Sequence, residues 1–137
     1  MSFTGISYLA VLFAGAAGFA FGAAYYMTLG AHWMAAIGKT KEQIAGNRSP
    51  VPFIIAAVAQ LVIAFMLAGV MGHLGAGTMT AMGGLVSGLF LWFGFVITTM
   101  AVNYAFQGAK PILTVIDGAH WLGVLLLQGL IIGWMGV

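Results

Sequence analysis

Four long apolar runs dominate the chain, and short polar segments separate them. The runs cover approximately residues 6–29, 51–72, 79–106 and 112–137. Each run reaches the roughly 20 residues that an α-helix needs to cross the hydrocarbon core of a bilayer. The pattern predicts an all-α fold, an integral membrane four-helix bundle in which residues 1–137 form a single transmembrane domain.

The segments that precede three of the runs carry residues typical of helix boundaries. These segments are SPVP at 49–52, GAGT at 75–78 and GAKP at 108–111. Pro111 suits the first position of a helix, where a backbone N–H would have no hydrogen-bond partner within the helix. A helix over the whole third run would be about 42 Å long, whereas the hydrocarbon core is about 30 Å thick. The third helix is therefore expected to tilt, bend or project into the headgroups.

Residues 31–49 form the loop between the first two runs and have some order of their own. In residues 31–45, Trp33, Met34 and Ile37 come before a group of charged side chains. This mixture predicts a short interfacial helix within the loop. An ordinary loop anchored by Trp33 is the alternative interpretation.

The basic residues lie in two of the connecting loops. Lys39, Lys41 and Arg48 follow the first run, and Lys110 follows the third. The N-terminus, residues 73–78 and the C-terminus contain no Lys or Arg. Short loops that carry positive charge stay in the cytoplasm. Both termini are therefore predicted to be non-cytoplasmic.

The overall composition agrees with a chain embedded in lipid. Hydrophobic residues make up 63% of the sequence and charged residues 4%, whereas soluble domains are about 25% charged. The expected partner of this excess apolar surface is the lipid bilayer. Nucleic-acid binding is not expected, because the basic residues form no patch with interleaved aromatics. The absence of cysteine excludes disulfides, thiolate metal sites and cysteine nucleophiles.

Polar side chains within the predicted spans are few, and they gather toward the predicted cytoplasmic side. Thr99, Asn103 and Gln107 recur every four residues, which places them on one helix face. Asp117 and His120, which are three residues apart, also share a face of the fourth span. The candidate polar or substrate cluster comprises Tyr25, Tyr26, His32, Thr99, Asn103, Tyr104, Gln107, Asp117 and His120.

This cluster has two interpretations. In the first, Asp117 and His120 handle protons or ions at the base of an inward-facing cavity, because a carboxyl group partly removed from water holds its proton more tightly and imidazole titrates near neutral pH. In the second, the cluster joins the helices structurally. Asp117 then pairs with Lys110 or a tyrosine hydroxyl, and Asn103 bonds to a neighbouring helix, each bond contributing about 0.6 kcal/mol.

Other polar residues in or near the spans lie apart from this cluster. Gln60 is near the middle of the second span, Gln128 is in the outer half of the fourth, and His73 belongs to the opposite side of the membrane. His32 and His120 could converge, but His73 could not join them. The three histidines therefore predict no metal site. The sequence also predicts no cofactor and no catalytic residues.

Glycine pairs with four-residue spacing occur in three spans. The pairs are Gly18 and Gly22, Gly84 and Gly88, and Gly129 and Gly133. This spacing lets helix backbones approach closely, within the bundle, between subunits, or both. Because four short helices bury little internal surface, a homo-oligomer with closed symmetry is expected.

Several segments resemble a family of small bacterial membrane proteins known as DUF1761. Residues 22–26 (GAAYY) and 30–34 (GAHWM) resemble the end of that family's first helix, and residues 88–106 resemble its third. Residues 116–119 (IDGA) are similar to the start of its fourth helix. The chain departs from the family at residues 25–28, where YYMT replaces a common WYSP. The resemblance implies four helices and a bacterial plasma (inner) membrane, and it implies no activity.

The polar cluster favours an oligomeric transporter or channel for a small solute or ion. The alternative is an accessory or scaffold subunit of a larger membrane complex, with a membrane protein as partner, because the chain has almost no mass outside the bilayer. An enzyme is not predicted, because no nucleophile–base pairing or metal-ligand spacing is present.

Overall fold

The computed structural model describes residues 3, 5–46 and 48–136. Val137, at the end of the predicted fourth span, and residues 1, 2, 4 and 47 of the predicted domain lie outside the described residues. In chain order the elements are α1 (Tyr8–Ile37), α2 (Lys41–Ala45), α3 (Val51–Leu74), the 3-10 helix η1 (Ala76–Thr78), α4 (Ala81–Leu91), the π-helix η2 (Trp92–Val96), α5 (Ile97–Phe106) and α6 (Pro111–Met135).

The described residues form an all-α structure with four membrane-length helices. These are α1, α3, the continuous span from α4 through α5, and α6, and each is long and apolar enough to cross a membrane. The predicted all-α fold with four spans is confirmed, and the chain is a multi-pass membrane protein by the length and composition of these helices.

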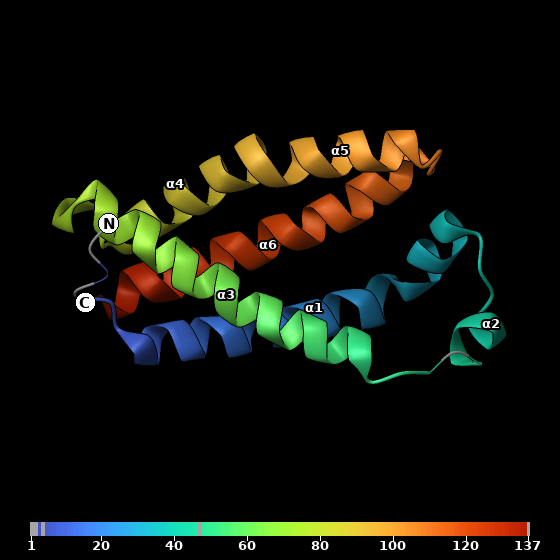
Figure 1. The fold of residues 1–137 in the computed structure, drawn as a ribbon, viewed down its shortest axis with the longest axis horizontal. Coiled ribbons are helices and arrows are strands. Elements are labelled where there is room, and N and C mark those ends of the chain that lie inside the picture. The colour runs from blue at the N-terminus through green and yellow to red at the C-terminus, as the bar shows by residue number, and fades with distance from the viewer. Residues whose placement is uncertain (1–2, 4, 47, 137) are drawn as a thin grey trace.

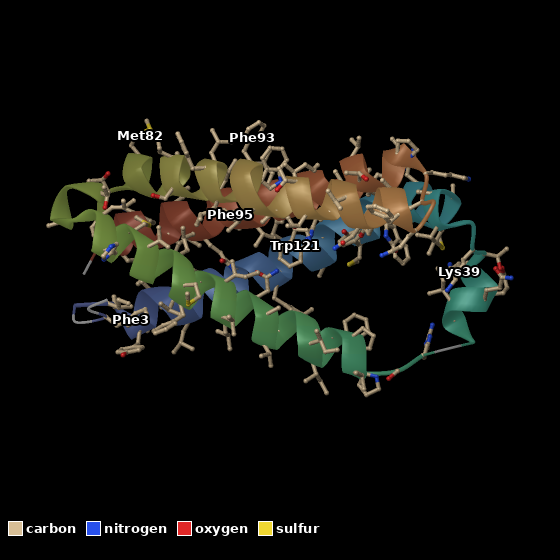
Figure 2. All side chains as sticks on the ribbon, turned by 45° about the horizontal axis from the view of Figure 1, so that its top comes forward. Phe3, Lys39, Met82, Phe93, Phe95 and Trp121 are labelled. Atoms are coloured by element: carbon tan, nitrogen blue, oxygen red, sulfur yellow. The ribbon has the colours of Figure 1, made fainter. Side chains whose placement is uncertain are left out.

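The four spans alternate in direction, so their connections lie at two opposite ends (Figure 1). Both chain ends and the α3–α4 connection lie at one end, while α2 and the α5–α6 turn lie at the other. The second end carries Lys39, Lys41 and Lys110, and we call it the basic end. Figure 2 places Lys39 there. The side of the membrane that each end faces remains a prediction.

The first helix is longer than the sequence pattern predicted. It begins after Ser7, whose hydroxyl accepts a hydrogen bond from the Ala10 N–H at 3.2 Å, and ends at Gly38 in the left-handed conformation. Residues 31–37 continue this helix, so the interfacial helix predicted over 31–45 is wrong in that part. Packing explains the extension, because Ala36 is buried against Leu113 and Ile116 of α6.

Only a short helix remains in the loop. The five-residue helix α2 follows Thr40, whose hydroxyl accepts a hydrogen bond from the Gln43 N–H, while the Gln43 side chain accepts one from the Thr40 N–H. This reciprocal pair is a capping box, and it satisfies two N–H groups at the start of the helix.

The third span contains one wide turn. The π-helix η2 lies between α4 and α5 and has Gly94 at its centre, and the Ile97 N–H bonds to the Trp92 carbonyl five residues earlier. The span begins at Ala81, later than the predicted residue 79, because the Thr80 hydroxyl caps the helix by accepting from the Gly83 N–H. A π turn holds about one residue more than an α turn, so it changes which side chains of α5 face the bundle.

Helix α6 is the central element, and glycines let α4 pack directly on it. A Cβ added to Gly84 would overlap the Gly129 carbonyl, and one added to Gly133 would overlap the Thr80 carbonyl. A Cβ on Gly88 would lie 2.6 Å from the Leu125 carbonyl oxygen. Backbone therefore meets backbone along the α4–α6 contact, and the glycine pairs predicted in the third and fourth spans act at this contact.

The outer surface of the bundle is apolar. Met82 and Phe93 on the third span are each 68% exposed, and Figure 2 shows both pointing away from the other helices. The buried interior near the chain ends contains Leu67 and Met71 of α3 and Ile132 of α6. This distribution suits helices whose outer side chains contact lipid.

Candidate functional site

A buried carboxylate joins three helices near the basic end. Asp117 of α6 is 8% exposed. The hydroxyl of Tyr26 on α1 donates to its Oδ1 at 2.6 Å, and the hydroxyl of Tyr104 on α5 donates to its Oδ2 at 2.8 Å. Both carboxylate oxygens are thus occupied by phenol donors from different helices.

The helical periodicity places these groups together. Leu113, Asp117, His120 and Val124 follow one another at intervals of three or four residues and are all buried, which marks the inner face of α6. Neighbouring Tyr25 donates its hydroxyl to the Ile116 carbonyl at 2.6 Å. Two adjacent tyrosines of α1 therefore hold two adjacent residues of α6.

His120 packs among the same aromatic rings. Its ring centroid lies 4.9 Å from that of Tyr26 and 5.5 Å from that of Tyr25. A Cβ on Gly22 would lie 2.9 Å from the imidazole Nε2, so the glycine makes room for the ring. His120 is 6% exposed, and its Nδ1 has no hydrogen-bond partner among the described residues. We call Tyr25, Tyr26, Tyr104, Asp117 and His120 the tyrosine–aspartate cluster.

No cation neutralises this carboxylate within the described residues. Lys110, which was one predicted partner of Asp117, donates instead to the Ala35 carbonyl near the end of α1, at 3.1 Å. An ionised carboxyl group that accepts two hydrogen bonds becomes, after protonation, a group that donates one. Protonation would add one O–H donor to the carboxyl group, while both oxygens would keep acceptor capacity.

The remaining predicted cluster residues lie elsewhere. His32, Thr99, Asn103 and Gln107 are all exposed. The Thr99 hydroxyl donates to the Phe95 carbonyl of its own helix at 2.6 Å. The structure thus brings together five of the nine candidates. Thr99, Asn103 and Gln107 lie apart because Tyr104 is the residue of this helix that faces α6, and successive residues of a helix point about 100° apart. His32 lies on an exposed face of α1.

A second buried polar pair lies deeper in the bundle. The side-chain N–H groups of Gln128 donate to the Gln60 backbone carbonyl at 3.2 Å and to the Gln60 Oε1 at 2.7 Å. A Cβ on Gly18 would lie 2.7 Å from the Gln128 Nε2. The sequence marked both glutamines as polar residues within spans, but not that they pair. Their pairing depends on the tilt of α3 against α6, which no sequence signal gave.

The indole of Trp92 makes one further link that the sequence analysis missed. Its Nε1–H donates to the Gly118 carbonyl at 2.8 Å. The link starts in the π-helix η2 and ends one residue after Asp117. The available sequence signal was spacing, because Trp92 lies seven residues before Thr99 and so shares its face of a regular helix.

Two surface hollows lie apart from the tyrosine–aspartate cluster. One of about 490 Å³ is at the basic end, and one of about 400 Å³ is between α1 and α3. They are lined respectively by Ile37, Gly38, Lys39 and Gln43, and by Tyr8, Val11, Leu12, Leu61, Val62 and Phe65. Across the described residues, no three His, Cys, Asp or Glu side chains gather as a metal site.

Comparison with known proteins gives a family and no activity. A family model described as "Protein of unknown function (DUF1761)" matches residues 9–133. No curated protein matches the chain, and no solved structure matches it. The matched residues include the whole tyrosine–aspartate cluster. The resemblance seen in the sequence is confirmed, and the chain belongs to the DUF1761 family of proteins of unknown function.

Proposed function

We propose that this protein is an oligomeric carrier or channel for a small solute or ion, located in the plasma (inner) membrane of a bacterium, and that Asp117 is its proton-binding centre. The observation that carries the proposal is the buried carboxylate held by Tyr26 and Tyr104 without a cationic partner among the described residues. Ionisable residues inside membrane spans are costly, and they commonly mark ion and proton pathways.

The position of the cluster supports this role. Asp117 is seven residues beyond Lys110 (117 − 110), which is about 10 Å along the helix. If the basic end faces the cytoplasm, as the distribution of positive charge predicts, Asp117 lies within reach of protons from that side. His120, three residues further along α6, is a second side chain of the cluster that can carry a proton.

Proton binding would change how α5 sits on α6. The ionised carboxyl group accepts from both tyrosines, whereas the protonated one has its own O–H and must donate it. The new O–H competes with the tyrosine donors, so one tyrosine hydroxyl can turn from donor to acceptor or leave. The Tyr104 bond is the weaker tie, because α5 has no buried residue and is joined to α4 through a wide π turn. Release of this bond would let α5 move away from α6.

A specific observation favours the accessory-subunit alternative. Both oxygens of Asp117 are already occupied, and neither hollow includes a residue of the tyrosine–aspartate cluster. In that role the cluster only joins α1, α5 and α6. A larger complex would then contain a foreign membrane protein in fixed ratio to this chain.

Proton flux into liposomes distinguishes the two functions. Purified protein would be reconstituted with a pH-sensitive dye inside, and a potassium diffusion potential would drive protons inward. The proposal predicts flux above that of protein-free liposomes, and background flux for Asp117→Asn. Thr98→Val is the matched control, because the Thr98 hydroxyl donates only to the Gly94 carbonyl of its own helix. Background flux for the unmodified protein, together with a foreign subunit in native mass spectra, would refute the transport proposal.

A further inference from the structure

Asp117 and His120 are two buried ionisable side chains on one face of α6. Asp117 is 8% exposed and His120 is 6% exposed. They are three residues apart, a spacing that makes side chains neighbours on the surface of a helix. Tyr26 of α1 reaches both, because its hydroxyl donates to the Asp117 Oδ1 at 2.6 Å and its ring centroid lies 4.9 Å from that of His120. The carboxyl group and the imidazole therefore belong to one buried site.

Each of these two side chains lacks a partner that its burial requires. The donors to Asp117 are phenol hydroxyls, which carry no charge, so they leave the negative charge of a buried carboxylate without a counter-ion. The His120 Nδ1 has no hydrogen-bond partner among the described residues. A buried unpaired charge and a buried polar atom without a hydrogen bond both raise the free energy of the folded protein.

The ionisable groups around this pair supply no positive charge. They are Tyr25 and Tyr26 on α1 and Tyr104 on α5. Helix α4 contains no ionisable residue, and the one in α3 is His73, in the last turn of that helix. Lys110 donates to a backbone carbonyl of α1. Within the described part of the chain no cation reaches the pair, and a proton is the charge that would neutralise it.

We propose that Asp117 and His120 share one proton, with the Asp117 carboxyl group and a His120 ring nitrogen hydrogen-bonded to each other. A hydronium ion of the aqueous phase gives up this proton and becomes water. The proton forms either an O–H bond that donates to the imidazole or an N–H bond that donates to the carboxylate. In both forms the pair has no net charge and the ring nitrogen gains a partner.

The surroundings of the pair allow this bond to form without breaking the others. A carboxylate has about four lone-pair sites, and the described hydrogen bonds from Tyr26 and Tyr104 occupy two of them. Gly22 leaves space at the other side of the imidazole, because a Cβ at this position would lie 2.9 Å from the His120 Nε2. The imidazole can therefore bond to Asp117 while the two tyrosines keep their hydrogen bonds.

This inference rests on the proposed binding of a proton at Asp117, and it adds the second residue that holds this proton. It does not depend on transport. His120 gives the O–H of a protonated Asp117 an acceptor other than a tyrosine hydroxyl. A protein that carries the shared proton but conducts no protons into liposomes would refute the transport proposal alone.

The sequence makes nuclear magnetic resonance a direct test of the pair. Asp117 is the single aspartate and there are three histidines, so aspartate labelled with ¹³C at its side-chain carboxyl group gives one signal, and histidine would be labelled with ¹⁵N in the ring. In lipid bilayers at neutral pH, we expect a ¹⁵N–¹³C dipolar coupling of hydrogen-bond range between the Asp117 carboxyl carbon and one histidine ring. We also expect the chemical shifts of either a protonated carboxyl group or an imidazolium ion.

His120→Phe and His32→Phe are matched variants for assigning the coupling. His120→Phe keeps an aromatic ring at the site and should lose the coupling completely, whereas His32→Phe should retain it because His32 is exposed. Three results would overturn the inference: no coupling in the unmodified protein, an ionised carboxyl group together with a neutral imidazole, or a coupling that survives in His120→Phe. The first two come from the unmodified protein, so misfolding of a variant cannot produce them.

Discussion

At the residue scale, the chemistry of Asp117 depends on which donors its neighbours supply. A lysine would neutralise the carboxylate permanently, but Lys110 instead donates to the Ala35 carbonyl near the end of α1, where basic side chains stabilise helix ends. Phenol hydroxyls of Tyr26 and Tyr104 take the place of the cation. The carboxylate is therefore held by neutral donors from two helices and not by a cation.

Replacing one of these donors should lower stability measurably. Tyr104→Phe leaves Oδ2 of a buried carboxylate without a donor. We therefore expect the free energy of unfolding to fall by about 1 kcal/mol, a value between the average for hydrogen bonds in membranes and that for hydrogen bonds to charged groups. Unfolding in mixed detergent micelles would measure the loss. Tyr8→Phe is the control, because Tyr8 is 65% exposed. Equal stability of the two variants would show that the Tyr104 bond contributes nothing.

The sequence predicted part of this site. Asp117 was expected to pair with a tyrosine hydroxyl or with Lys110, and the tyrosines are its partners. Asn103 was grouped with the same cluster but is exposed. Spacing along a helix shows which residues share a face, whereas packing decides which face turns inward. Asn103 is exposed although it is the direct sequence neighbour of the inward-facing Tyr104.

At the element scale, the π turn decides the orientation of α5. Trp92, the first residue of the π-helix, donates to the Gly118 carbonyl, and beyond the π-helix Tyr104 donates to Asp117. Both contacts reach α6 because the wide turn absorbs about one residue more than an α turn. The sequence indicated that the third span must tilt, bend or project, but not that a π turn occurs within it.

Deleting Gly94 should therefore be tolerated. The deletion converts the π turn to a regular α turn and keeps Trp92 and Tyr104 directed at α6. Gly94 itself lies in open space, because no atom lies within 4 Å of the position that a Cβ on it would take. Deleting Val102 instead rotates the end of α5 by about 100° and removes Tyr104 from Asp117. We expect the Val102 deletion to lower the unfolding free energy by at least the Tyr104→Phe loss, and the Gly94 deletion to lower it less. The reverse order in detergent unfolding would contradict this account of the π turn.

At the scale of the whole molecule, the four spans were predictable because membrane-length apolar runs have few alternatives to a helix. The extension of α1 beyond residue 29 was harder to predict from the sequence. Hydrophobicity falls after Leu29, at Gly30 and His32, yet the helix continues to Ile37 because Ala36 packs on α6. That contact joins residues far apart in sequence, and local patterns do not report it.

The orientation of the bundle is the remaining whole-molecule prediction, and single cysteines can test it in intact cells. Gly77 lies in η1, in the connection at the end that also holds both chain ends, and Lys39 lies at the basic end. Because positive loops are retained in the cytoplasm, a membrane-impermeant maleimide should label Gly77→Cys from outside and Lys39→Cys only after permeabilisation. Labelling of Lys39→Cys from outside would place Asp117 on the non-cytoplasmic side, and the proton supply of the proposed transport cycle would then have to come from there.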